Sequence, residues 1–213
     1  MEDNYRHQGK RKLLAEKLAD KGIKDEQVLE AIAHIPRHLF LDSSFEDHAY
    51  QDKAFPIAAG QTISHPYTVA FQTELLQVKR GEKILEVGTG SGYQAAVLKY
   101  LGAKVYTIER QHKLYKKTAN FLKNIGYSPK YITFGDGYKG IKAYAPYHKI
   151  IVTAGAPYIP KDLMAQLKIG GRLVIPVGED PQIMTLLIRK DVKKFEKYTF
   201  GEFRFVPLLE NKN

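Results

Sequence analysis

The chain of 213 residues contains no cysteine and only 3 methionines. Without cysteine, it cannot form disulfide bonds, thiolate zinc sites, cysteine-ligated iron–sulfur clusters or a cysteine nucleophile. No apolar run approaches the roughly 20 residues that span a bilayer. The charged stretch 1–20 also lacks the apolar core of a signal peptide. We therefore expect a soluble, cytoplasmic protein without a membrane partner.

Asparagine is scarce as well, with 5 residues, none of which precedes a glycine. A low content of thermolabile residues together with abundant lysine resembles the composition of heat-adapted proteins. This hypothesis of a thermophilic origin predicts a melting temperature above that of mesophile domains.

The net charge of +10 raises the question of a nucleic-acid partner. Residues 1–60 hold 9 basic and 11 acidic side chains, and residues 61–213 hold 24 and 12. The excess is mostly lysine, spread thinly, and the few arginines argue against many base or phosphate contacts. The densest stretch, 189–194, contains an acid and lies where a hairpin turn is expected. We favour a solvated turn there and expect no nucleic-acid partner.

The length and the 44% hydrophobic content predict one globular domain of the α/β size class. Its parts are N-terminal helices with a substrate loop (1–80), a cofactor-binding βα core (81–178) and C-terminal strands (179–213). Apolar spacing predicts helices over 8–20, 25–34, 66–78, 93–101, 111–124 and 160–168. Strands are predicted over 83–87, 104–108, 131–134, 149–153, 172–177, 182–189, 195–200 and 202–208, and an irregular loop over 36–62. The order predicts a doubly wound, mostly parallel Rossmann-like sheet with helices on both faces and antiparallel C-terminal strands.

A glycine-rich loop, EVGTGSGY over residues 86–93, follows the first strand of the alternating region. Its glycines allow a tight turn and the close approach of a ligand. The dinucleotide fingerprint G-x-G-x-x-G is not met, because Tyr93 takes the place of the third glycine. A carboxylate such as Glu86 suits a ligand with a cationic amino-acid part, S-adenosylmethionine for example, better than a pyrophosphate. We expect Glu86, Gly88 and Gly90 to bind such a ligand; a loop with only a packing role is the alternative.

Acidic residues end the next two strands. Glu109 ends the second, where a carboxylate can accept hydrogen bonds from ribose hydroxyls. Asp136, followed by Gly137, ends the third and is placed to reach the adenine amino group; an ordinary turn aspartate is the alternative. Three such strand ends resemble those of the class I S-adenosylmethionine-dependent methyltransferases. Residues 153–157 lack the Asn-Pro-Pro-Tyr-like motif of exocyclic-amine enzymes, and the missing cysteine excludes pyrimidine C5 enzymes.

The segment before the first strand narrows the resemblance to one family. Residues 52–66, DKAFPIAAGQTISHP, resemble the signature loop of the protein-L-isoaspartate O-methyltransferases, and HIPRHLF over residues 34–40 resembles a motif upstream of it. Three downstream segments, 151–157, 167–173 and 206–208, are also similar. The resemblance runs from about residue 10 to residue 209. Its Gln-Thr-Ile-Ser loop is far more specific than the glycine loop, which all class I methyltransferases share.

The resemblance implies a protein-repair enzyme. Such an enzyme transfers the methyl group of S-adenosylmethionine to the free α-carboxylate of L-isoaspartyl residues in damaged proteins and peptides. The products are S-adenosylhomocysteine and a methyl ester that closes to a succinimide. The acceptor carboxyl has a pKa of roughly 3.5 and is already ionised, so no general base is required. The protein's task is to position the carboxylate and exclude water.

Ser64 is the residue that the resemblance places between cofactor and acceptor, where its hydroxyl would position the carboxylate. Read from the local sequence alone, Ser64 is a helix N-cap, and both roles remain open. By the same resemblance, Gln61, Thr62 and Ile63 line the cofactor and peptide channel, and the loop 52–64 is expected to close over the cofactor.

Two positions depart from the family pattern, which usually has glycine where Ala58 stands and aspartate where His148 stands. Neither touches the main cofactor positions. His34 and His38 are four residues apart, but Pro36 breaks a helix between them, so we expect no metal site. Two competing functions remain: a class I methyltransferase acting on RNA or a small molecule, and a non-catalytic module on the same fold. The oligomeric state is left open.

Overall fold

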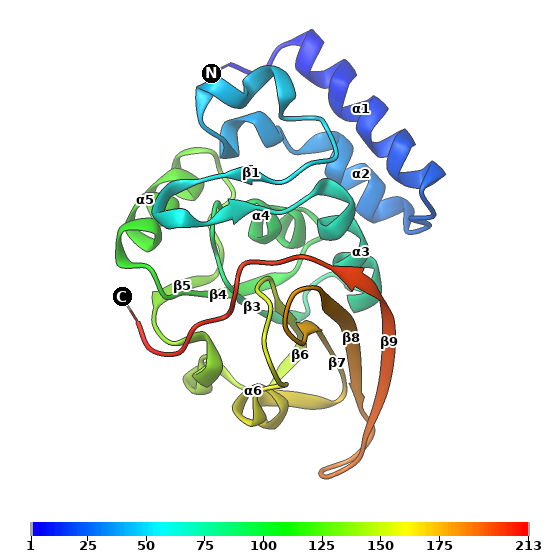
Figure 1. The fold of residues 1–213 in the computed structure, drawn as a ribbon, viewed down its shortest axis with the longest axis vertical. Coiled ribbons are helices and arrows are strands. Elements are labelled where there is room, and N and C mark those ends of the chain that lie inside the picture. The colour runs from blue at the N-terminus through cyan, green and yellow to red at the C-terminus, as the bar shows by residue number, and fades with distance from the viewer. Residues whose placement is uncertain (1, 213) are drawn as a thin grey trace.

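A seven-stranded mixed sheet forms the centre of the protein, which we describe from a computed structural model covering residues 2–212 (Figure 1). The strand order is β5-β4-β3-β6-β7-β8-β9. The bounds are β3 Lys83–Val87, β4 Lys104–Glu109, β5 Tyr131–Phe134, β6 Tyr147–Val152, β7 Leu167–Val177, β8 Gln182–Arg189 and β9 Phe195–Phe203. Strands β3 to β7 are parallel, and β8 and β9 are antiparallel to their neighbours. The predicted sheet is thereby confirmed.

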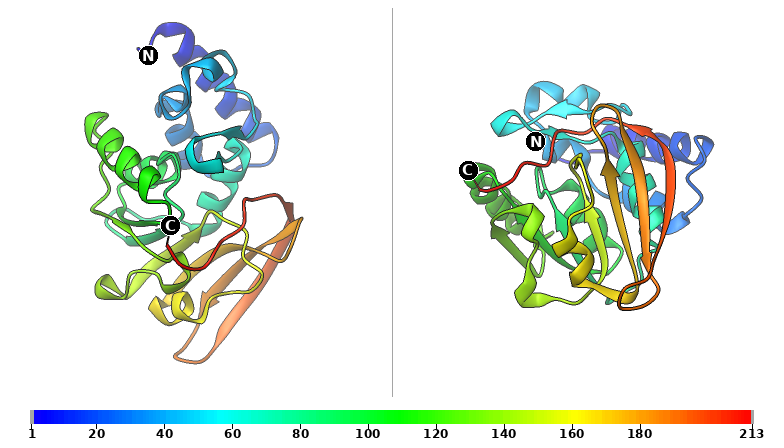
Figure 2. Two further views of the ribbon diagram at one scale, coloured as in Figure 1. Left: turned by 60° about the vertical axis from the view of Figure 1, so that its left-hand side comes forward. Right: turned by 60° about the horizontal axis from the view of Figure 1, so that its bottom comes forward.

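Both faces of the sheet are buried. Successive side chains of a strand point to opposite sides, so each strand contributes to two separate cores. Ile84 and Val105 belong to a core formed with α1 to α5, whereas Leu85 and Tyr106 belong to a second core with α6. The helices are α1 Tyr5–Asp20, α2 Glu26–His34, α3 Pro66–Leu76, α4 Tyr93–Tyr100, α5 His112–Asn124 and α6 Lys161–Gln166. Figure 2 shows the sheet and the helices that flank it from two further directions. Helices on both faces were predicted and are found.

The N-terminal part differs in detail from the prediction. Helix α1 begins earlier than expected, because the side chain of Asn4 caps it by accepting a hydrogen bond from His7 N (3.0 Å). The predicted irregular loop contains three short 3₁₀ helices, η1 Arg37–Phe40, η2 Ser43–His48 and η3 Ala58–Gly60. It also contains a small hairpin of β1 Phe55–Pro56 and β2 Thr62–Ile63.

The end of the chain requires a correction. Two strands, 195–200 and 202–208, were predicted, but a single strand, β9, runs through Gly201 and ends at Phe203. Phe203 pairs with Gln182, the first residue of β8, so the chain beyond it has no partner strand. It instead crosses the carboxyl ends of the parallel strands, as the red segment of Figure 1 shows.

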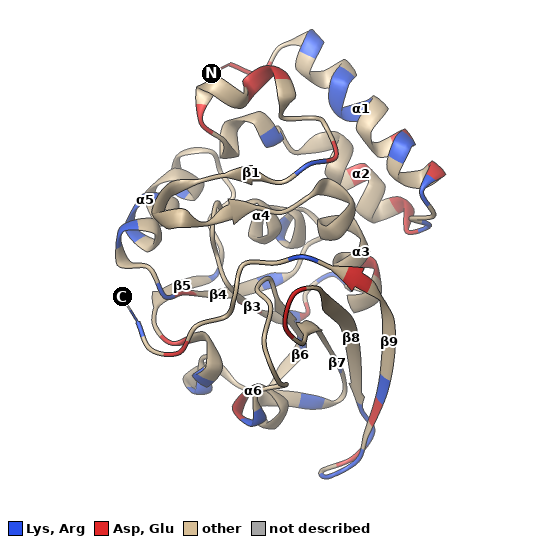
Figure 3. Cartoon of the chain, in the orientation of Figure 1, with Lys and Arg blue, Asp and Glu red and all other residues tan. Residues whose placement is uncertain are grey.

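The end of α6 and the start of β7 also differ from the prediction. Strand β7 begins at Leu167, earlier than expected, so α6 ends at Gln166. The predicted turn between β8 and β9 is present, and Lys190 N donates to Lys194 O across it (2.8 Å). Lysine and arginine are scattered over α1, α5 and this hairpin (Figure 3). Among the helices of residues 2–212, none has both the length and the apolar composition needed to cross a membrane.

Candidate active site

A cleft of about 770 Å³, partly open to solvent, lies at the carboxyl ends of β3 and β4. Its walls come from the glycine loop, the β1–β2 hairpin and the C-terminal segment. Eight of the ten predicted site residues line it: Gln61, Thr62, Ile63, Ser64, Gly88, Gly90, Glu109 and Gly137. The structure therefore brings together residues that are up to 76 positions apart in the sequence, as the strand order predicts.

The glycine loop turns sharply because its backbone adopts positive φ angles, 97° at Gly88 and 86° at Gly92. A Cβ atom on Gly88 would lie 2.5 Å from Thr153 Oγ1, whose hydroxyl is 2.7 Å from Gly88 O. A Cβ on Gly92 would come within 2.9 Å of the Leu122 side chain. Gly92 thus allows the start of α4 to lie close to Leu122 of α5.

Glu109 is buried at the end of β4 and holds the glycine loop in place. Its Oε2 accepts a hydrogen bond from Gly90 N (2.9 Å), and its Oε1 accepts one from Gln111 N (2.9 Å). A carboxylate has about four acceptor positions, so capacity remains for two ligand hydroxyls. The predicted contact to ribose is compatible with this arrangement.

The structure does not bring Glu86 to the cleft. Its side chain is fully buried, and neither carboxylate oxygen has a hydrogen-bond partner among residues 2–212. Burial raises the pKa of Glu86 to about 8; the Thr107 hydroxyl opposes this shift and the Glu109 carboxylate adds to it. Glu86 is thus a mainly neutral acid behind the loop at pH 7, and its predicted contact with the cofactor has no geometric support.

Asp136 also lies outside the cleft lining, although Gly137 belongs to it. Asp136 Oδ1 accepts a hydrogen bond from Tyr138 N (2.9 Å), which is the turn role that the sequence left open. A Cβ on Gly137 would come within 2.6 Å of Val87 Cγ1, so glycine is required for this close packing. The contact of Asp136 with adenine stays a prediction.

Ser64 lines the cleft at the end of the β1–β2 hairpin and is half-buried. It does not cap α3, because the N-cap position is His65, which makes no side-chain capping bond. Asp52 Oδ1 instead accepts the hydrogen bond from Tyr67 N in the first turn (2.8 Å). The N-cap alternative for Ser64 is therefore wrong, and no hydrogen bond joins its hydroxyl to the rest of the described chain.

Arg37 is a site residue that the sequence did not single out. Its guanidinium is fully buried and donates to three carbonyl oxygens: Ala49 (3.0 Å), Lys53 (3.2 Å) and Ser64 (2.8 Å). It also lies 4.9 Å from the centre of the Tyr93 ring. Burial lowers the pKa of Arg37 to about 10, which leaves it charged at neutral pH. Arg37 thereby fixes the backbone of Ser64 relative to α4.

The C-terminal segment forms another wall that was not predicted as part of the site. Residues Val206 to Leu209 line the cleft. Gly155 N donates to Val206 O (2.9 Å), and Leu208 N donates to Gly155 O (2.7 Å). A second, smaller hollow of about 280 Å³ shares Ser64 and Val206 with the cleft and is lined by Arg204.

Ala58 and His148, the two residues that differ from the family pattern, lie at positions where the substitution strains no backbone and removes no group from the cleft. Positive φ occurs at Ala59 (60°) and Gly60 (65°), not at Ala58, so alanine at position 58 costs no backbone strain. His148 lies near the start of β6, away from the carboxyl ends of the strands, and its Nδ1 accepts a hydrogen bond from Lys83 N (3.1 Å).

A sequence model described as Protein-L-isoaspartate(D-aspartate) O-methyltransferase (PCMT) matches residues 8–213. A Christiangramia forsetii protein named protein-L-isoaspartate O-methyltransferase is 73% identical over 213 residues, the full length of both chains. A solved structure of that name has a TM-score of 0.84 and 28% identity, covering 92% of this chain and 65% of its own. A Plasmodium falciparum structure, described as this methyltransferase in complex with S-adenosyl-L-homocysteine, has a TM-score of 0.79 and 26% identity, covering 93% and 98%. The chain belongs to the protein-L-isoaspartate(D-aspartate) O-methyltransferase family.

Proposed function

We propose that this protein repairs damaged proteins by methylating the free α-carboxylate of L-isoaspartyl residues, with S-adenosylmethionine as the methyl donor. The observation that carries the proposal is one cleft that joins the Gln61–Ser64 segment to the glycine loop and Glu109. The Gln61–Ser64 segment is the part of the sequence most specific to the family. The glycine loop and Glu109 are the part suited to a nucleoside. The methyl ester would close to a succinimide after release.

The residues present fit S-adenosylmethionine. A side chain on Gly88 would clash with Thr153, and positive φ at Gly88 and Gly90 lets the loop backbone face a ligand closely. Glu109 retains acceptor capacity for two ribose hydroxyls. When bound, S-adenosylmethionine supplies a methyl group on a sulfonium, which is a good leaving group. We assign its binding to Gln61–Ser64, Gly88, Gly90, Glu109 and Gly137.

The acceptor side is assigned to the small hollow beside Ser64. The hollow shares Thr62, Ser64 and Thr153 with the cleft, so a group placed in it meets the cofactor side at Ser64. The Ser64 hydroxyl makes no hydrogen bond to residues 2–212 and can donate one to the acceptor carboxylate. Arg204 also lines the hollow; its side chain is 82% exposed, and its Nε lies 3.4 Å from Asp180 Oδ1.

The chain's contribution to catalysis is positioning. The acceptor is ionised at neutral pH, since an α-carboxyl has a pKa of roughly 3.5, so no residue has to remove a proton. Arg37 holds the Ser64 carbonyl, and Ser64 holds the carboxylate in line with the methyl group. Closure of the loop 52–64 would exclude water from the reacting atoms.

Methyl transfer to matched substrates tests the proposal. The protein is incubated with methyl-labelled S-adenosylmethionine and an isoaspartyl peptide, the aspartyl peptide of the same sequence, or RNA. Base-labile label in the isoaspartyl peptide alone is the expected result. Label in RNA would indicate the competing methyltransferase activity, and cofactor binding without any transfer would indicate a non-catalytic module; either outcome rejects the proposal.

We propose a cytoplasmic location, where damaged proteins and S-adenosylmethionine would both be available. The partners would be isoaspartyl proteins and peptides and not nucleic acid, because the Lys and Arg positions are spread over several elements of the chain (Figure 3).

A further inference from the structure

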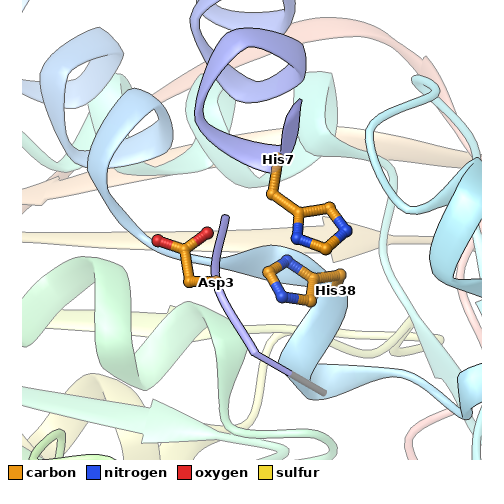
Figure 4. Close-up of side chains that lie close together, drawn as sticks. All are labelled: Asp3, His7 and His38. Atoms are coloured by element: carbon orange, nitrogen blue, oxygen red, sulfur yellow. The ribbon is translucent and has the colours of Figure 1, made fainter. Parts of the chain in front are cut away.

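Two buried histidines and an aspartate meet at the N-terminal end of the molecule, outside the cleft. His7 lies in the first turns of α1, His38 in η1, and Asp3 just before α1. One ligand atom from each lies within 4.8 Å of the others. The two imidazole rings are stacked, with centroids 3.9 Å apart, and the Asp3 carboxylate lies beside them (Figure 4).

Each histidine has one ring nitrogen engaged and one without a partner. His7 Nε2 lies 3.1 Å from Glu46 Oε1, and His38 Nδ1 lies 2.7 Å from the Tyr50 hydroxyl. His7 Nδ1 and His38 Nε2 are buried and have no hydrogen-bond partner among residues 2–212. The two residues are only 5% and 0% exposed, so bulk water does not reach these atoms, and each unpaired polar atom costs stability.

From this arrangement we infer a binding site for a divalent transition metal, with Zn²⁺ as the best match, formed by Asp3, His7 and His38. Two imidazole nitrogens and one carboxylate oxygen are donors that Zn²⁺ prefers, and water would complete a tetrahedral set. A metal would engage the two nitrogens that have no partner. The site uses His38 with His7, and His34 is not part of it, because its ring packs against Tyr100 (4.7 Å).

The groups around the two rings suit a metal site. A histidine ligand normally donates its second N–H to a carboxylate or another oxygen, which fixes the tautomer. Glu46 and the Tyr50 hydroxyl occupy those places here.

Charge and distance are both compatible with binding. Asp3 and Glu46 face the rings as anions, and Arg11 is the opposing cation, with Nη1 on Asp3 Oδ1 and Nε on Ala33 O. A tetrahedral metal at about 2.1 Å from its ligands holds them about 3.4 Å apart, so the ligand atoms must approach by at most about 1.4 Å. The two rings, stacked at an interplanar angle of 22°, must also turn so that one nitrogen of each points at the metal. Asp3 lies before α1 with its side chain 29% exposed, so its segment can supply part of this movement.

Zinc titration of chelator-treated protein without an affinity tag tests the inference. We expect calorimetry to show one Zn²⁺ per chain and the melting temperature to rise by several degrees with ZnCl₂. Replacement by Co²⁺ should give the visible absorption of tetrahedral cobalt. Neither readout depends on methyl transfer, so failure of the proposed function would leave this test intact.

Three variants locate the site. Asp3→Asn changes a partly exposed side chain that precedes α1 and should weaken Zn²⁺ binding at least tenfold without loss of folding. His7→Gln should weaken it at least a hundredfold, and His34→Gln, the matched control, should bind like the original protein. Absence of saturable binding would overturn the inference. Equal affinities for all three variants would do so too, because the metal would then lie elsewhere.

Discussion

At the scale of single residues, the position of Ser64 in the cleft leads to a direct prediction for its hydroxyl. Ser64→Ala removes a hydroxyl that makes no bond within the described chain and does not cap α3. We therefore expect little change in melting temperature, nearly unchanged binding of S-adenosylhomocysteine, and a fall in kcat of about 100-fold, as for a misplaced acceptor. Turnover with an isoaspartyl peptide and calorimetry with S-adenosylhomocysteine measure the two effects.

The control for this prediction is Ser43→Ala, which changes an exposed serine outside the cleft. If Ser64→Ala turned over substrate as fast as this control, Ser64 would have no part in positioning the acceptor.

Glu86 makes stability depend on pH. Its pKa is about 8 in the folded protein and near the ordinary 4.5 in the unfolded chain. Between these values the folded state binds the extra proton, so the free energy of unfolding falls as pH rises, by at most about 1.4 kcal/mol per pH unit. Below pH 4.5 the stabilisation is fully present, and it is lost as pH rises through about 8.

The variant Glu86→Gln keeps the shape of the neutral acid and cannot ionise. The loss between pH 5 and pH 8 is about 4 kcal/mol, so we expect the variant's melting temperature, relative to the original protein, to be roughly 10 °C higher at pH 9 than it is at pH 5. Glu179→Gln, at an exposed acid, should show no such trend. A difference that is the same at both pH values would mean that Glu86 is ionised throughout this range.

At the scale of elements, the C-terminal segment completes the cleft in which we propose that the cofactor binds. Deletion of residues 206–213 removes one wall and its two hydrogen bonds to Gly155, whereas deletion of 210–213 leaves both. We expect the first deletion to weaken S-adenosylhomocysteine binding at least tenfold and the second to change it little. Circular dichroism establishes that each protein is folded before calorimetry. Equal affinities would show that this segment only lies near the ligand.

The sequence predicted the elements that meet at the cleft, because parallel strands end at one edge of a sheet and their loops must gather there. The cofactor contact expected of Glu86 stays a prediction without geometric support, because residues two apart share a face of a strand. Glu86 lies with Ile84 on the face that packs against α1 to α5, so the loop backbone lines the cleft instead. Arg37 was missed because its partners are 12, 16 and 27 residues away and come together only through packing.

At the scale of the whole molecule, the charge of +10 should affect how fast acidic substrates arrive. Arg110 lines the cleft and Arg204 lies at the adjoining hollow, so the positive charge includes the entrance. Screening limits such attraction to about 8 Å at physiological ionic strength. The effect should therefore be visible at low salt and disappear at high salt.

Two isoaspartyl peptides that differ only in glutamate or glutamine beside the damaged residue test this expectation. The ratio of kcat/KM for the glutamate peptide to that for the glutamine peptide should be several-fold above one at low salt and approach one as salt is raised. Arg204→Gln should reduce the low-salt ratio, because the exposed Arg204 side chain lines the same hollow as Ser64. A ratio independent of salt would mean that local contacts, and not the field of the protein, set any preference between the peptides.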